Sequence, residues 1–234
     1  MASPGPSTHS GPAAFFEPYR RQWQVLLRIT RREGHAHRLF GIERLFLMGV
    51  CLALLGMPAM IVRGLGQIFG EQGRRLAVEF YALGKPALLF WVLFHGHLTS
   101  ALWAAVAVVA LLDLYTSLSS MVFLQHFHTG RTSHGRSLIL LAVNFTETLL
   151  AFAVLYGFSQ SVGNPMQGDT APVTDPFTLL YFSCVTAASV GYGDFLPTTH
   201  AGRMIALAQI LTSMGFIFIL LTSFVASFNE REPV

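Results

Sequence analysis

The sequence predicts an all-α integral membrane protein with four transmembrane helices and one shorter, re-entrant helix. Hydrophobic residues make up 53% of the 234 residues and charged residues only 12%, a balance that is unusual for a soluble domain. Four apolar stretches are long enough to cross about 30 Å of hydrocarbon: 45–62, 86–112, 137–158 and 204–228. A fifth stretch, 176–188, is too short to span. Apolar runs without alternation exclude a β-barrel.

We expect residues 1–38 to form a cytoplasmic segment that contains a basic amphipathic helix. The apolar side chains of this helix share one face: Tyr19, Trp23, Leu26 and Leu27. Arginines surround that face. This pattern is typical of a helix that lies on an anionic membrane surface. A helix that packs on a loop of the same protein is the alternative.

Residues 39–136 are predicted to hold two transmembrane helices and their loops, and positive charge orients them. Seven arginines precede the first span, which predicts a cytoplasmic amino terminus: Arg20, Arg21, Arg28, Arg31, Arg32, Arg38 and Arg44. An even number of spans returns the carboxyl terminus to the cytoplasm, so we expect a multi-pass protein of the plasma or inner membrane. One loop fits less well, because Arg74, Arg75 and Lys85 would lie outside.

Residues 186–194 read TAASVGYGD, with two glycines separated by one residue. Gly191 and Gly193 can adopt positive φ without steric cost, and such residues let successive peptide groups alternate in conformation. Alternation of this kind can line up carbonyl oxygens along one side of a loop.

This run resembles the selectivity filter of the potassium-channel family, in which loops of the TVGYG type from four subunits present carbonyl oxygens to a dehydrated K⁺ ion. Five residues match one for one, with serine in place of threonine: Ser189, Val190, Gly191, Tyr192 and Gly193. The resemblance implies that the first four coordinate K⁺, the permeant ion, through their carbonyls. It also implies that Val190 and Tyr192 turn their side chains away from the pore and pack behind the filter.

The resemblance covers about residues 137–228, and it implies a pore domain over 137–234 with outer helix, pore helix, filter and inner helix. Because each chain supplies one filter strand, a homotetrameric pore is expected. Asp175 and Pro176 predict the start of the pore helix, and Ala188 its end.

Four residues are implied to support the filter: Asp194, Tyr181, Phe182 and Thr186. Tyr181 and Phe182 stand where the family has bracing aromatic residues, and the Tyr181 hydroxyl is expected to hydrogen-bond to Asp194. Core packing of the two aromatic rings is the alternative, and it is compatible with bracing.

Two residues are candidates for bending the inner helix. Ser213 stands where many family members have a glycine at which this helix bends, and Gly215 follows two residues later. Glycine and serine together favour a kink. Close packing against another helix is the other explanation for Gly215.

Ionisable residues inside a predicted span form the last set of gating candidates. Glu147 and His97 each fall near the middle of a span, where charged groups are costly. They predict a buried pair that titrates near neutral pH, with His95 as a second possible partner. A structural role for Glu147 beside Asn144 is the alternative.

The sequence therefore predicts a channel, not an enzyme, that conducts K⁺ passively and selectively. A potassium transporter subunit and a non-conducting regulatory membrane subunit are the alternatives, and the intact single pore loop disfavours both. We expect further copies of the chain and membrane lipid as partners, with a regulatory protein at the amino terminus as a further candidate. No feature predicts binding to nucleic acid.

Overall fold

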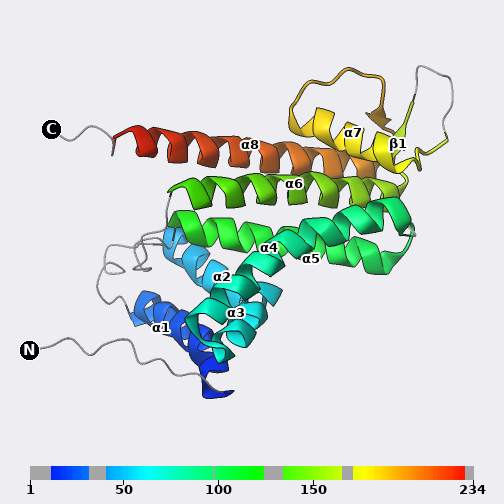
Figure 1. Ribbon diagram of the computed structural model, residues 1–234. Coiled ribbons are helices and arrows are strands. Elements are labelled where there is room, and N and C mark those ends of the chain that lie inside the picture. The colour runs from blue at the N-terminus through cyan, green and yellow to red at the C-terminus, as the bar shows by residue number, and fades with distance from the viewer. Residues whose placement is uncertain (1–11, 32–40, 97, 124–133, 165–170, 230–234) are drawn as a thin grey trace, which may run out of the picture. The chain divides into compact units, whose positions relative to one another are not determined.

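The computed structural model describes residues 12–31, 41–96, 98–123, 134–164 and 171–229, and most of them are helical (Figure 1). This confirms the predicted all-α class. The elements are η1 (Pro12–Phe16), α1 (Glu17–Arg31), α2 (Ile42–Gly56), α3 (Pro58–Ile68), α4 (Gly70–His95), α5 (Ala101–Phe123), α6 (His134–Ser159), β1 (Val162–Gly163), α7 (Pro176–Ala187), β2 (Leu196–Pro197) and α8 (His200–Asn229).

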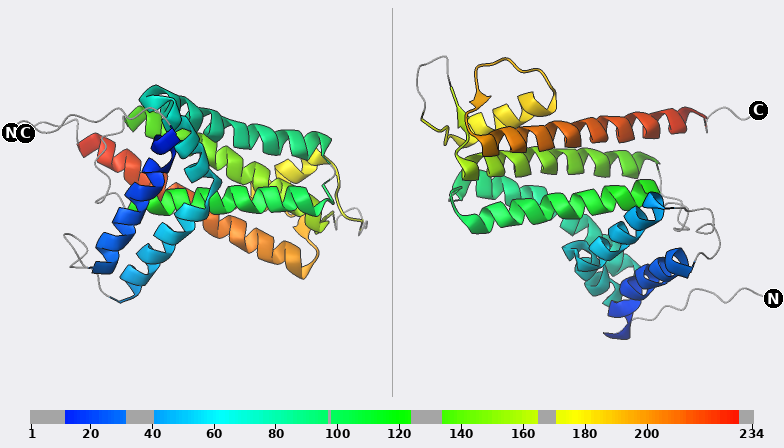
Figure 2. Two further views of the ribbon diagram at one scale, coloured as in Figure 1. Left: turned by 90° about the horizontal axis from the view of Figure 1, so that it is seen from below. Right: turned by 180° about the vertical axis from the view of Figure 1, so that it is seen from behind.

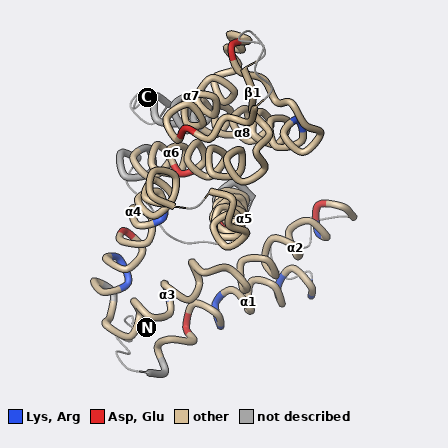
Figure 3. The backbone as a smooth tube through the Cα atoms, turned by 90° about the vertical axis from the view of Figure 1, so that its right-hand side faces the viewer, with Lys and Arg blue, Asp and Glu red and all other residues tan. Residues whose placement is uncertain are grey.

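The chain forms two compact units, and α4 and α5 contribute to both. Residues 1–83 and 112–131 make up the first unit, and residues 84–111 and 132–234 make up the second. Among the described residues, most lysines and arginines lie on α1, α2, α3 and α4 (Figure 3).

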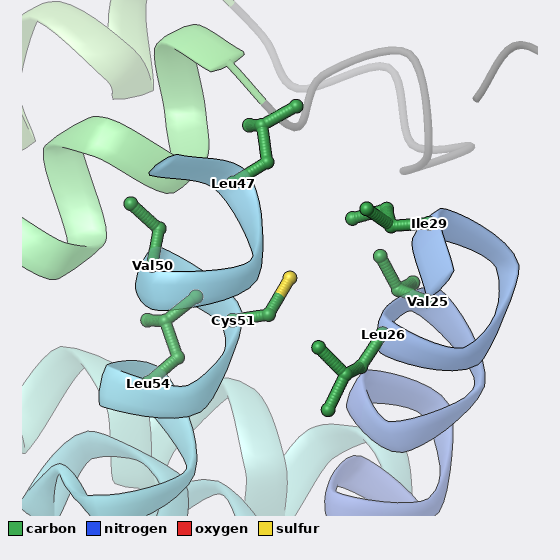
Figure 4. Close-up of a cluster of buried hydrophobic side chains, with 7 residues drawn as sticks. All are labelled: Val25, Leu26, Ile29, Leu47, Val50, Cys51 and Leu54. Carbon is green, nitrogen blue, oxygen red and sulfur yellow. The ribbon is translucent and has the colours of Figure 1, made fainter. Parts of the chain in front are cut away.

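In the first unit, α1 packs on α2 through a buried apolar cluster (Figure 4). Its members are Val25, Leu26, Ile29, Leu47, Val50, Cys51 and Leu54. Leu26 is only 7% exposed, whereas Trp23 is 51% exposed. Of the predicted apolar face only Leu26 is buried in this contact. The partner of α1 is a helix, so packing on a loop is wrong, and contact with a membrane surface stays a prediction.

The predicted first span, 45–62, is wrong as a single helix. Helix α2 ends at Gly56, Met57 is extended with φ −83° and ψ 146°, and Pro58 begins α3. The two helices are bent by 58°. Proline has no amide hydrogen and its ring clashes with the preceding turn, so a helix rarely continues through the residue before it.

Asp113, near the middle of α5, holds the start of α3 in the first unit. Its side chain is 1% exposed. Oδ1 accepts from the Ala59 amide at 3.4 Å and Oδ2 accepts from the Tyr81 hydroxyl at 3.0 Å. One carboxylate therefore connects α3, α4 and α5, and it supplies the acceptor that the first turn of α3 lacks locally.

The predicted second span, 86–112, is also wrong as a single helix. Helix α4 ends at His95 and α5 begins at Ala101. The amides of Trp103 and Ala104 donate to the Ser100 carbonyl, at 3.2 and 3.3 Å, which places Ser100 at the start of the new helix. Serine is a favoured residue at this position.

The predicted third and fourth spans are confirmed in the second unit as α6 and α8. These two helices lie side by side, and the short α7 packs against both (Figures 1 and 2). In the described part of the chain, four helices are long and apolar enough to cross a membrane: α4, α5, α6 and α8. By length and composition the number is therefore four, as predicted, or five if the bent pair α2–α3 counts as one span. Helices α4 and α5 replace the first two predicted spans.

The α1–α2 cluster can be tested by truncating one buried side chain. Ile29→Ala should lower the free energy of unfolding by about 2–5 kcal/mol, because Ile29 is fully buried and its removal leaves a cavity. Leu52→Ala, on the exposed side of α2, should have little effect. Thermal unfolding in detergent, combined with limited proteolysis of α1, measures both; equal losses would contradict the assigned packing.

Candidate functional site

The start of α7 agrees with the sequence prediction. Asp175 is the N-cap residue, and its Oδ2 accepts from the Thr178 amide at 2.8 Å and from the Thr178 hydroxyl at 2.6 Å. These hydrogen bonds, that of the hydroxyl first, hold the pKa of Asp175 below its usual value. Pro176 occupies the first turn, where its missing amide hydrogen is not needed.

The end of α7 is a Schellman motif. The Ser189 amide donates to the Thr186 carbonyl at 3.0 Å and the Val190 amide donates to the Val185 carbonyl at 3.1 Å. Ser189 has φ +54°, a left-handed conformation that glycine usually supplies at this position. Ala188 is the C-cap residue, as predicted.

The loop that follows alternates in backbone conformation. Gly191 has φ +61° and Gly193 has φ +80°, as predicted, and Ser189 adds a third positive φ. A planar trans peptide points its N–H and its carbonyl in opposite directions. Since the Val190 N–H faces back to α7, the Ser189 carbonyl faces away from that helix. The loop can therefore offer oxygens on the side opposite α7.

The far end of the loop is anchored to α7. The Tyr181 hydroxyl donates to Asp194 Oδ2 at 2.8 Å, which is the predicted hydrogen bond. Asp194 Oδ1 accepts from the Phe195 amide at 3.0 Å, and the Phe195 ring meets the Tyr181 ring edge to face at 6.1 Å.

A short antiparallel pairing ties the next residues to the end of α6. Val162 pairs with Pro197 and Gly163 with Leu196 in β1 and β2. The Thr198 amide donates to the Ser161 carbonyl at 2.7 Å. The loop is therefore fixed at both ends by contacts within the second unit.

The other two predicted support residues contact the outer helix α6. Phe182 is 6% exposed and meets the Tyr156 ring edge to face at 4.9 Å. Thr186 interacts with the Tyr156 hydroxyl. Phe182 thus packs in the core, whereas Tyr181 contacts the loop through Asp194.

Two loop side chains are not covered as expected. Val190 is 50% exposed and Tyr192 is 68% exposed. The predicted packing behind the filter is therefore not supplied by this chain alone. Large apolar side chains with such a high exposed fraction need another partner to cover them.

No pattern along the sequence pointed to the buried polar side chains that join α6, α7 and α8. Tyr156 on α6, Ser183 on α7 and Gln209 on α8 are each 0% exposed, and hydrogen bonds connect them. One signal could have found Gln209, because a lone amide in an apolar span usually binds a neighbouring helix.

Glu147 is buried and pairs with a lysine of α4. Glu147 is 0% exposed on α6, and its Oε1 lies 3.0 Å from Lys85 Nζ on α4. His95 is ten residues further along α4, about 15 Å along its axis, so the predicted pairing with His95 is wrong. His97 lies outside the described residues.

The inner helix passes both predicted bending residues without a break. Helix α8 is continuous from His200 to Asn229. Ser213 is 1% exposed, whereas a Cβ at Gly215 would meet no heavy atom within 4 Å. Close packing within the described chain therefore does not explain Gly215.

The fold and the loop define a class of protein: a multi-helix membrane protein in which a short helix ends in a loop of alternating conformation. Residues 140–230 match the family model described as "Ion channel". No solved structure matches the chain.

Three curated proteins are similar to part of the chain. "Probable potassium channel protein 2" of Methanocaldococcus jannaschii is 31% identical over 102 residues, 42% of this chain and 26% of that protein. "Two pore potassium channel c" of Oryza sativa is 35% identical over 38% of this chain and 19% of its own length. "Two-pore potassium channel 2" of Arabidopsis thaliana is 32% identical over 42% of this chain and 21% of its own length. The chain therefore covers about a quarter or less of each relative.

The anchor of the loop at Asp194 can be tested without changing the loop itself. Tyr181→Phe keeps the ring but removes the hydroxyl that donates to Asp194. Amide hydrogen exchange in residues 190–196 should become severalfold faster, because the far end of the loop is released. Tyr19→Phe on α1 is the control and should leave this exchange unchanged; protection that survives Tyr181→Phe would show that the hydrogen bond does not hold the loop.

Proposed function

We propose that this chain is a subunit of a channel that conducts K⁺ passively and selectively across a membrane. The observation that carries the proposal is the alternating backbone of residues 189–193, which follows a helix end whose hydrogen bonds turn the first carbonyl away from α7. Such a loop replaces the hydration shell of a K⁺ ion with carbonyl oxygens. The carbonyls of Ser189, Val190, Gly191 and Tyr192 are the proposed ligands.

The choice of K⁺ rests on the sequence of the loop and on the relatives. The names of all three similar proteins include the words "potassium channel", and the loop reads SVGYGD. The proposed role is transport and not catalysis. The pore domain is proposed to be residues 137–234.

The functional unit is proposed to be a homotetramer. One loop supplies oxygens on one side only, so a closed ring around an ion needs several copies. The exposed side chains of Val190 and Tyr192 support this, because neighbouring subunits would cover them. The exposed apolar side chains of α8 would face the other subunits and lipid: Met204, Leu207, Leu211, Met214, Ile217 and Phe218.

We propose that both termini lie in the cytoplasm, at a plasma or inner membrane. With α4, α5, α6 and α8 as the spans, the bent pair α2–α3 would stay on the cytoplasmic side. Arg74 and Arg75 then lie at the cytoplasmic start of α4 and no longer contradict the positive-inside rule. If α2 and α3 crossed as one span, the two termini would lie on opposite sides.

We propose two places where the pore could be regulated. The inner helix would bend near Ser213 and Gly215, since a glycine without a neighbour inside the chain offers little resistance to bending. The second place is the Lys85–Glu147 ion pair, which holds α4 on the outer helix α6. Glu147 would act through this contact on the position of the outer helix.

Ion flux into liposomes tests the function directly. Purified protein in K⁺-loaded liposomes should take up Rb⁺ with a large preference over Na⁺. Gly191→Ala should abolish selectivity or conduction, because a Cβ resists the left-handed φ of +61° at this residue. Gly49→Ala, in a helix where a Cβ would meet nothing within 4 Å, is the control.

The alternatives give different results in the same assay. A transporter subunit would need a coupled ion or an energy source, and a non-conducting subunit would show no uptake at all. Equal permeation of Na⁺ and Rb⁺ would exclude a selective K⁺ pore.

The ion pair can be tested by changing one residue and then both. Glu147→Gln or Lys85→Met alone should destabilise the assembly by about 3–5 kcal/mol, because each leaves a charged group in an apolar site. The double variant Lys85→Met with Glu147→Leu should lose much less stability, because no buried charge remains. Thermal unfolding and Rb⁺ flux measure the outcome; single effects that simply add in the double variant would mean that the two residues act separately.

A further inference from the structure

Buried hydrogen bonds join the inner helix α8 to the pore helix α7 at Gln209. Nε2 of Gln209 donates to the Ser183 carbonyl at 2.8 Å and lies 2.7 Å from Ser183 Oγ. Oε1 of Gln209 accepts from the Tyr156 hydroxyl on α6 at 2.8 Å. Ser183 Oγ donates in turn to the Leu149 carbonyl on α6 at 2.8 Å. We call Tyr156, Ser183 and Gln209 the latch.

The chemistry of the latch fixes the orientation of the Gln209 amide. A main-chain carbonyl can only accept, so the NH₂ group of Gln209 must face Ser183 and its oxygen must face Tyr156. All three side chains are 0% exposed. In such a site an unpaired amide or hydroxyl is costly, and a fully paired network is rigid.

The latch contacts α7 just before the turn that begins the filter loop. Ser183 lies one helical turn before Ala187, the last residue of α7. The carbonyls of Val185 and Thr186, within that turn, accept from the amides of Val190 and Ser189. A shift of this turn would move the Ser189 carbonyl by a similar amount.

We propose that Gln209 is a positioning residue for selectivity, which acts through Ser183 to fix the last turn of α7 and so the Ser189 carbonyl. The proposal rests on the proposed K⁺ channel function. Gln209 does not touch the ion in this account. It fixes the distance between the inner helix and the pore helix. A change in this distance would move the Ser189 carbonyl in each of the four subunits.

The experiment compares stability with selectivity in the full-length assembly. Gln209→Leu keeps a side chain of similar size but removes every latch hydrogen bond to α8. The ratio of Rb⁺ to Na⁺ uptake in liposomes should fall by at least about tenfold, the equivalent of about 1.4 kcal/mol. Thr146→Val removes an exposed hydroxyl that bonds within α6, and this control should keep the wild-type ratio.

A double variant separates positioning from folding. Gln209→Leu with Tyr156→Phe removes both members of the Gln209–Tyr156 hydrogen bond, so thermal stability should return toward that of the wild type, apart from the lost contact of Tyr156 with Thr186. The uptake ratio should stay low, because α7 is still not held. If Gln209→Leu does not assemble, Tyr156→Phe alone should give a smaller fall in the ratio.

The outcomes for the two proposals are distinguishable. A wild-type protein without preference for Rb⁺ would overturn the channel function and the role of Gln209 with it. A selective wild type whose ratio is unchanged in the assembled Gln209 variants would overturn only the role of Gln209. Recovery of the ratio together with stability in the double variant would reduce the latch to a folding element.

Discussion

The end of α7 fixes the direction of the loop that follows, and α6 and α8 hold the loop and this turn in place. Two amides, of Ser189 and Val190, are held by carbonyls of the last helical turn. The first carbonyl of the loop must then face away from the helix. Positive φ at residues 189, 191 and 193 continues the alternation. A local backbone constraint thus determines which side of the loop presents its first carbonyl oxygen.

The surrounding helices hold this loop through buried or half-buried polar contacts. Tyr181 binds Asp194 at the far end, and the β1–β2 pairing ties the following residues to α6. Gln209 and Ser183 hold the near end. Hydrogen bonds of this kind are favourable where water is excluded, because the unpaired groups would have no substitute partner. The outer helix α6 and the inner helix α8 therefore also hold the loop in position.

Local signals explain why the start of α7 and the positive φ angles of the loop could be predicted from the sequence. Asp175 and Pro176 define a helix start from their own chemistry, and the glycine spacing defines the loop. The amino-terminal half could not be divided correctly, because hydropathy counts apolar residues but does not detect a helix break such as the one before Pro58. The contacts of Glu147 with Lys85, and of Gln209 with Ser183, depend on which helices pack together, and no pattern along the chain contains that information.

The position of a bound ion is the measurement that tests the central claim most directly. Crystals of the assembled protein grown with Rb⁺ or Tl⁺ would reveal such ions by anomalous scattering. The account predicts peaks on a fourfold axis, between successive rings of carbonyl oxygens from residues 189–192. An assembly in which these residues lie away from a symmetry axis, or in which their carbonyls face the axis without any bound ion, would contradict it.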